Sequence, residues 1–215
     1  MEPPMKEIYS PIVTMKPKHI QSVVQTHLVS FPGFFLSFLG SRFLMLYYEG
    51  ICEAPEGIGL VYLNASGGAA GFVAGSSNPR GFYSRLLKKD WLKFAFASIG
   101  AIIRKPTVIT RVARGLIHPG GNPLGDDVAG LFSIGVLPEL QGTGAGKKLV
   151  LAFFQEALNR GCKRLFLTTD RDENDAVNAF YQKLGFSIER QYETPEGRRM
   201  NEYWIDLDNK DTPNA

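Results

Sequence analysis

The stretch LFSIGVLPELQGTGAGKKLVLAFFQEALNRG, residues 131–161, decides the fold of this 215-residue chain. Its first six residues form a short apolar run, typical of a strand that is buried on both faces. Three glycines follow at positions 142, 144 and 146, and apolar residues then recur at helical spacing. The run KRLFLTT, residues 163–169, again predicts a strand. The order strand, glycine turn, helix, strand predicts a parallel pair joined by a crossover helix.

The glycine turn predicts a phosphate site, because the N–H groups at a helix N-terminus are unpaired and carry partial positive charge. It does not fit the phosphate loop of NTPases, because Gln141 stands where the first glycine belongs and Lys148 replaces the hydroxyl residue that would bind Mg²⁺. A dinucleotide fingerprint would need a third glycine at Lys147, although Asp170 lies near the distance expected for a ribose-binding acid. A dinucleotide-dependent oxidoreductase therefore stays open as an alternative.

A second helix is predicted from NDAVNAFYQKLGF, residues 174–186. Asn174 is a suitable N-cap, and Gly185 is a suitable C-terminal stop. Seven residues, about two helical turns, separate Asn174 from Tyr181. Both side chains are therefore expected to project from the same face.

These two motifs together resemble the GNAT superfamily of N-acetyltransferases. VLPELQGTGAG, residues 136–146, resembles the pyrophosphate loop Q/R-x-x-G-x-G/A, and residues 174–186 resemble the helix N-x-x-A-x-x-L-Y-x-K-x-G-F. The close match covers roughly residues 129–190, and the N-terminal half matches only in the order of its elements. The resemblance implies an α/β fold with a mixed sheet: antiparallel N-terminal strands, a central parallel pair with a crossover helix, and helices on both faces.

The resemblance also implies acetyl-CoA as the acetyl donor and no metal. The pantetheine arm would pair with the strand at residues 134–136, while N–H groups of residues 142–147 would hold the pyrophosphate. Gly135 would ease a bulge that separates this strand from its neighbour. The donor-binding residues implied in this way are Ile134, Gly135, Val136, Gln141, Gly142, Thr143, Gly144, Ala145, Gly146, Lys147 and Asn174.

Two catalytic residues are predicted. Tyr181 is the candidate general acid for the departing CoA thiolate, although it could also be only a core residue of its helix. Asp170, at the end of the second strand, is the best placed candidate base, with His118, Asp127 and Glu202 behind it. The demand for a base depends on the acceptor, because an alkylamine is almost fully protonated near pH 7 whereas an α-amine is partly neutral.

The expected function is transfer of acetyl to a primary amine by direct attack in a ternary complex. The acceptor would be a small molecule such as an amino sugar, or a peptide or protein amine, and the sequence does not choose between them. A non-catalytic CoA-binding sensor or scaffold domain is an alternative.

The rest of the chain is expected to complete a single domain over residues 1–207, with a polar tail at 208–215. Strands are predicted at residues 8–15, 58–64 and 69–75, a helix at 19–30, and a closing antiparallel pair at 187–193 and 201–207. Five of the fifteen Phe fall within residues 31–43, where they could pack in the core or touch the acceptor.

Composition excludes several classes of protein. The net charge of +3 does not demand a nucleic-acid partner, and no aromatic-basic repeat or zinc spacing supports one. Two cysteines form no disulfide framework, and the N-terminus lacks a signal pattern, so a cytoplasmic location is expected. The apolar runs are too short to span a bilayer. A monomer or a homodimer would suit the length.

Residues 80–114 contain nine basic residues and one acid, and an extended helical segment is predicted here. It could bind an anionic acceptor such as a nucleotide-linked amino sugar, or make peripheral contact with an anionic membrane, helped by FAFASI at residues 94–99. The simplest interpretation is a solvated helix face over a packed one.

Overall fold

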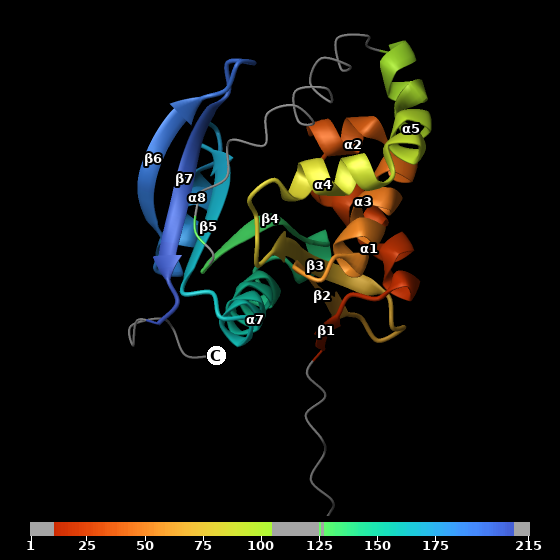
Figure 1. Ribbon diagram of the computed structural model, residues 1–215. Coiled ribbons are helices and arrows are strands. Elements are labelled where there is room, and N and C mark those ends of the chain that lie inside the picture. Colours follow the sequence, from red (N-terminus) through yellow and green to blue (C-terminus); the bar gives the residue numbers. More distant parts are fainter. Residues whose placement is uncertain (1–10, 105–124, 126, 209–215) are drawn as a thin grey trace, which may run out of the picture.

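A seven-stranded mixed sheet forms the centre of the computed structural model, which describes residues 11–104, 125 and 127–208 (Figure 1). The strand order is β1-β2-β3-β4-β5-β7-β6, and every neighbouring pair is antiparallel except the parallel pair β4–β5. The strands are β1 (Ile12–Thr14), β2 (Gly57–Leu63), β3 (Ala69–Ser76), β4 (Val128–Val136), β5 (Arg164–Asp170), β6 (Ser187–Glu193) and β7 (Arg199–Asp206).

Helices cover both faces of this sheet. Figure 1 shows α1 to α5 grouped on one side of the N-terminal strands, and α7 on the other side. The helices are α1 (Ile20–Ser30), α2 (Phe35–Leu39), α3 (Ser41–Glu53), α4 (Phe82–Lys89), α5 (Trp91–Arg104), α7 (Ala145–Asn159) and α8 (Asp175–Lys183), with short 3-10 turns η1 (Pro17–His19) and η2 (Pro138–Leu140). The predicted fold class, with its parallel pair and crossover helix, is confirmed.

The sheet separates two apolar cores because side chains alternate between its faces. On one face, Phe72 of β3 packs with Tyr48 of α3, and on the other Val73 packs with Phe153 of α7. Leu165 and Leu167 of β5 lie in the second core, which extends to α8. The run at residues 131–136 lies between these two layers, but within it only Leu131 and Gly135 are buried, so the prediction of a strand buried on both faces is confirmed only in part.

The parallel strands β4 and β5 pair only over their first halves. Pairing runs from Val128 opposite Arg164 to Leu131 opposite Leu167, and then stops. Beyond Leu131, β4 pairs only with β3, while the end of β5 pairs only with β7. Figure 1 shows the two strands starting together and pointing apart.

Several element boundaries differ from the predictions. The helix expected at 19–30 begins as the 3-10 turn η1, and α4 and α5 form the part of the basic segment up to Arg104. Residues 8–10 of the first predicted strand and 105–114 of the basic segment lie outside the described residues. The second strand of the closing pair begins at Arg199, two residues earlier than predicted.

The predicted bulge at Gly135 is wrong in its position. Ala74 lies opposite Ser133 and Gly75 opposite Leu131, so Phe132 is the extra residue. Gly135 is needed for another reason: a Cβ at this position would lie 2.8 Å from Ser30 Oγ and 3.0 Å from an edge carbon of Phe72. The absence of a side chain at Gly135 lets α1 approach β4 closely. The bulge at Phe132 lies just beyond Leu131, where the pairing of β4 with β5 ends.

Candidate active site

The second half of β4 presents a backbone edge toward the diverging β5. In the described part of the chain, no strand pairs with this edge after Leu131. Phe132, Ser133 and Ile134 are half-buried, whereas the preceding four residues are fully buried. Unpaired backbone groups in a half-buried strand can pair with an extended ligand as though it were another strand. Ile134, Gly135 and Val136, predicted to contact pantetheine, lie on this strand.

The glycine turn places the N-terminus of α7 directly after β4. Gly142 and Gly144 adopt left-handed backbone conformations with φ of 76° and 84°, which side-chain-bearing residues rarely adopt. Gly144 is the N-cap of α7, and no side chain caps the helix. The first-turn N–H groups, from Ala145 to Lys147, therefore have no intrahelical acceptor. The turn is exposed, and this geometry suits a phosphate.

Tyr181 lies in the second core as well as in the predicted site. Its ring contacts Tyr203 and Phe186 at centroid distances of 5.9 and 5.6 Å, and only 5% of the residue is exposed. Burial raises the pKa of the Tyr181 phenol well above its ordinary value. The phenol therefore stays protonated near neutral pH, as a proton donor must, although complete transfer of its proton is harder than in water.

Asn174 holds the start of α8 against β5 rather than capping the helix with its side chain. Its amide Nδ2 donates to Thr169 Oγ1 at 2.8 Å and to the Asp170 carbonyl at 3.0 Å. One turn later, Asn178 donates to the same carbonyl and accepts from Asn201 and from the Tyr203 hydroxyl. Asn174 is the N-cap residue of α8, as predicted, but its side chain makes no capping hydrogen bond because it turns back toward the strand.

Asp170 forms a bidentate ion pair with Arg198 from the β6–β7 hairpin. Arg198 Nε donates to Oδ1 at 2.9 Å and Nη2 donates to Oδ2 at 2.6 Å. The same guanidinium lies 5.7 Å from the ring centroid of Phe34, which is exposed in the turn before α2. The tip of the hairpin, the end of β5 and the Phe-rich segment therefore meet beside the diverging strands.

The other candidate bases are placed differently. Glu202 is buried on β7, where its oxygens accept hydrogen bonds from Arg190 and from Trp204 Nε1. Asp127 precedes β4, at the end of the strand opposite the glycine turn. His118 lies outside the described residues.

A buried polar chain under β4 was not found from the sequence. His27 Nδ1 lies 2.6 Å from the Tyr48 hydroxyl, and the Tyr47 hydroxyl lies 3.5 Å from that of Tyr83. Burial lowers the pKa of His27 to about 4 and raises that of Tyr47 to about 12. These groups are neutral near pH 7.

The contacts of Arg198 and Asn178 with Asp170 were also not predicted from the sequence. The spacing of Asn174 and Asn178, one helical turn apart, was a usable signal for Asn178.

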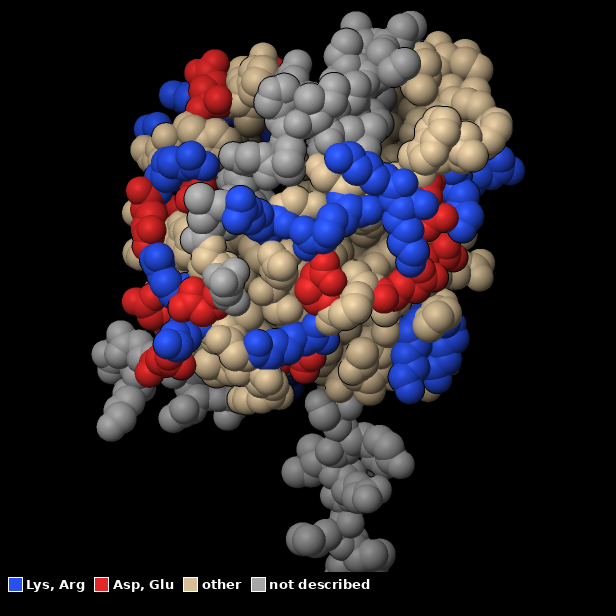
Figure 2. All heavy atoms as spheres, in the orientation of Figure 1, with Lys and Arg blue, Asp and Glu red and all other residues tan. Residues whose placement is uncertain are grey.

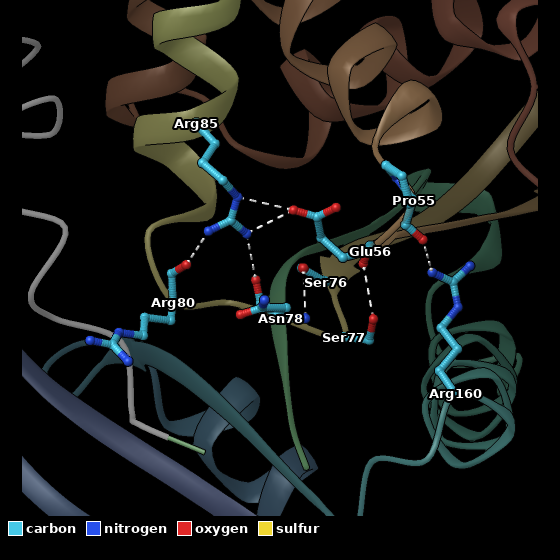
Figure 3. Close-up of polar contacts among 8 residues, drawn as sticks. All are labelled: Pro55, Glu56, Ser76, Ser77, Asn78, Arg80, Arg85 and Arg160. Carbon is cyan, nitrogen blue, oxygen red and sulfur yellow. Dashed lines mark hydrogen bonds and ion pairs between the residues drawn. The ribbon is translucent and has the colours of Figure 1, made fainter. Parts of the chain in front are cut away.

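A hollow of about 570 Å³ lies at the opposite end of α7 from the glycine turn. It lies between the α3–β2 turn, the end of β3 and the last turn of α7 (Figure 3). Arg85 donates twice to Glu56, and Arg160 donates to the Pro55 carbonyl. Its cations are already held by protein acceptors, and the 15-residue helix α7 is about 22 Å long. This hollow is therefore separate from the predicted donor site.

The strands therefore diverge beside an uncapped, glycine-rich helix N-terminus, which leaves a free backbone edge next to a turn suited to phosphate. The sequence model of the acetyltransferase (GNAT) family matches residues 27–186. The chain therefore belongs to the GNAT acetyltransferase family.

The single parallel pair in the sheet is also unlike the doubly wound parallel sheet that a dinucleotide-dependent oxidoreductase would require, so that alternative is wrong.

The curated relatives match only about a third of the chain. Mycothiol acetyltransferase from Paenarthrobacter aurescens is 39% identical over 70 residues, which are 33% of this chain and 21% of that protein. The enzyme of the same name from Saccharomonospora viridis is 34% identical over 88 residues, covering 38% of this chain and 27% of that protein. The chain thus spans about a fifth to a quarter of the length of these relatives.

Solved structures resemble the chain over most of its length. Ard1 from Thermoplasma volcanium has a TM-score of 0.59 at 19% identity, covering 91% of this chain and 95% of that one. An aminoglycoside 6'-N-acetyltransferase solved with coenzyme A has a TM-score of 0.60 at 13% identity, covering 93% and 98%. At these identities the likeness concerns the fold alone.

Proposed function

We propose that this protein transfers an acetyl group from acetyl-CoA to a primary amine by direct attack within a ternary complex. The observation that carries this proposal is the divergence of β4 and β5 beside the uncapped N-terminus of α7. An extended thioester can pair with the free edge of β4 while its pyrophosphate occupies the glycine turn. Membership in the family supports the same donor.

The proposed reaction needs no nucleophile from the protein. The neutral acceptor amine attacks the thioester carbonyl carbon, and a backbone N–H near Val136 stabilises the oxyanion. The carbon–sulfur bond then breaks, and the thiolate takes a proton from Tyr181. The new amide loses its extra proton to a base or to water. Tyr181 regains its proton from solvent, and CoA leaves.

Asp170 stays the candidate base, but its contacts favour a positioning role. Both carboxylate oxygens already accept hydrogen bonds from Arg198, so an incoming ammonium must share them. An acceptor amine with a low pKa needs little help, because a useful fraction is neutral near pH 7. Amines of that kind, including peptide N-termini and amino sugars, therefore head the list of acceptors. The name of the curated relatives adds mycothiol-related amines to that list.

The first experiment is calorimetric titration of the protein with acetyl-CoA, with NADH as the comparison ligand. We expect micromolar binding of acetyl-CoA and none of NADH. Release of free CoA thiol is then measured against a panel of amines. A protein that does not bind acetyl-CoA would contradict the proposal. A protein that binds it, but turns over no amine and gains a partner on binding, would instead be a CoA sensor.

Two glycine variants locate the donor site. Gly142 and Gly161 have nearly equal φ of 76° and 81°, and a Cβ at either would meet nothing within 4 Å. Alanine should therefore strain both positions alike, by about 1 kcal/mol. We expect Gly142→Ala to weaken acetyl-CoA binding at least tenfold, while Gly161→Ala leaves it unchanged. If both variants weakened acetyl-CoA binding equally, the pyrophosphate would not bind at the glycine turn.

A further inference from the structure

One helix of this protein presents an apolar face to solvent that the fold does not use. Five of the nine large hydrophobic residues that are exposed in the described part of the chain lie on α5. Four of them are spaced by four, three and four positions, which places them in one stripe along the helix. The stripe consists of Leu92, Phe96, Ile99 and Ile103, exposed by 46 to 76%, and Trp91 at the start of α5 is exposed by 61%.

The other face of α5 already supplies the packing that the fold needs. Phe94, Ser98 and Ala101 are buried, and the Phe94 ring meets Phe43 of α3 in an edge-to-face contact at 4.9 Å. A helix that is apolar on both faces is expected where both faces are covered. The exposed stripe therefore indicates a contact with something beyond this chain's own core.

Basic residues accompany the stripe. Residues 80–104 contain six Lys or Arg and one acid, Asp90. Three of these cations pair with acids: Arg85 with Glu56, Lys89 with Glu53 and Lys93 with Asp90. Six positive charges less these three acids leave a local charge of +3. Figure 2 shows Lys and Arg side chains as a band over α4, next to the mainly uncharged surface of α5.

A shallow groove extends the apolar surface toward α3. It has a volume of about 340 Å³ and lies between α3 and α5, beside Phe96. Met45 and Leu46 contribute apolar lining, and two cations, Arg42 and Lys93, and one acid, Glu49, also line it. Apolar side chains with cations at their margin match the interface of a bilayer that contains anionic lipid.

We propose that α5 and the last turn of α4 bind the surface of an anionic lipid bilayer. At 14 residues, α5 is about 21 Å long and lies flat rather than spanning, and none of the helices described could cross a membrane. The charge argues against a second copy of the chain, because a two-fold contact through the stripe would bring two sets of surplus positive charge together. Anionic headgroups would instead compensate these charges.

The test is co-sedimentation of the full chain with phosphatidylcholine vesicles, with and without phosphatidylglycerol. We expect binding only to the anionic vesicles, and weaker binding at high salt. Phe96→Ser combined with Ile103→Ser should weaken it at least tenfold, since both side chains are exposed and their loss leaves the core intact. Lys88→Glu, which changes charge without changing the stripe, should weaken it severalfold.

Ile188→Ser is the matched control, because Ile188 is an exposed apolar residue on β6. It should bind vesicles as the unmodified chain does. Absence of binding to anionic vesicles at low salt, or equal binding by the double variant, would overturn the proposal. A stable dimer in light scattering that the double variant abolishes, without vesicle binding, would show that the stripe is instead an interface between two copies.

Discussion

Tyr181 has to meet two demands, because its ring packs in the core while its hydroxyl is the proposed proton donor. We expect Tyr181→Phe to keep the fold and acetyl-CoA affinity while lowering kcat about 100-fold. Since burial raises the pKa of the Tyr181 phenol, its deprotonation should not lower kcat of the unmodified enzyme below about pH 10. Steady-state kinetics and thermal unfolding of the variant check both points.

Tyr203→Phe is the control for this experiment. Its ring lies 5.9 Å from Tyr181, and its hydroxyl donates to Asn178 Oδ1 at 3.0 Å. We expect a loss of about 1 kcal/mol in stability with kcat largely retained. If Tyr181→Phe turned over acetyl-CoA as fast as the unmodified enzyme, Tyr181 would be a core residue only.

His27 makes the stability of this protein depend on pH. Burial lowers its pKa from 6.5 to about 4, so the unfolded chain binds a proton at mildly acidic pH that the folded chain does not. The contribution of neutral His27 to the free energy of unfolding is therefore fully present above about pH 6.5 and is lost as the pH falls toward 4. The loss should be on the order of 3 kcal/mol. Urea unfolding at pH 7.5 and 4.5, compared with His27→Phe, measures it, and equal losses in both proteins would exclude His27 as the cause.

At the scale of elements, two glycines with opposite surroundings test how tightly the layers pack. A Cβ at Gly75 of β3 would lie 2.1 Å from the Gly130 carbonyl oxygen and 2.7 Å from the Phe153 ring, whereas one at Gly100 of α5 would meet nothing within 4 Å. We expect Gly75→Ala to destabilise the fold by about 3 kcal/mol. Gly100→Ala should stabilise it by about 0.5 to 1 kcal/mol, because alanine favours the helix.

Denaturant midpoints of the two variants give both values. A Gly75→Ala protein as stable as the original would mean that β3 and β4 can separate locally without loss. Since β4 pairs with β3 at this point and no longer pairs with β5 beyond Leu131, local separation of β3 and β4 would also change the proposed donor site.

For the whole molecule, the proposed donor should bind between β4 and β5, which do not pair beyond Leu131, and should therefore stabilise the folded protein. Acetyl-CoA at 100 times its dissociation constant should stabilise the folded protein by about 2.7 kcal/mol. For a chain of this length that corresponds to a rise in Tm of roughly 5 to 10 °C. Thermal unfolding with increasing acetyl-CoA measures it, with NADH as the control. A Tm independent of acetyl-CoA would contradict the proposed donor.

Residues close together in the sequence were sufficient to predict most of the elements and the glycine turn before α7. Apolar periodicity predicted the crossover helix. The glycines at 142 and 144 predicted a tight turn, and both adopt the left-handed backbone conformation in it. These signals are local, because a helix or a tight turn is determined mainly by its own residues. Element order and motif spacing then predicted the parallel pair and the family.

Only the tertiary structure determined the contacts at the ends of β4 and β5 and on the surface. Asp170 and Arg198 are 28 residues apart, and Ser30 and Val136 are 106 apart, so no spacing in the sequence reveals their pairing. The bulge at Phe132 and the buried pairing of His27 with Tyr48 likewise depend on how distant elements pack. The same holds for α5, whose sequence is apolar on several sides. Burial of one face against α3, which leaves the stripe exposed, results from packing between helices and is not encoded in the helix itself.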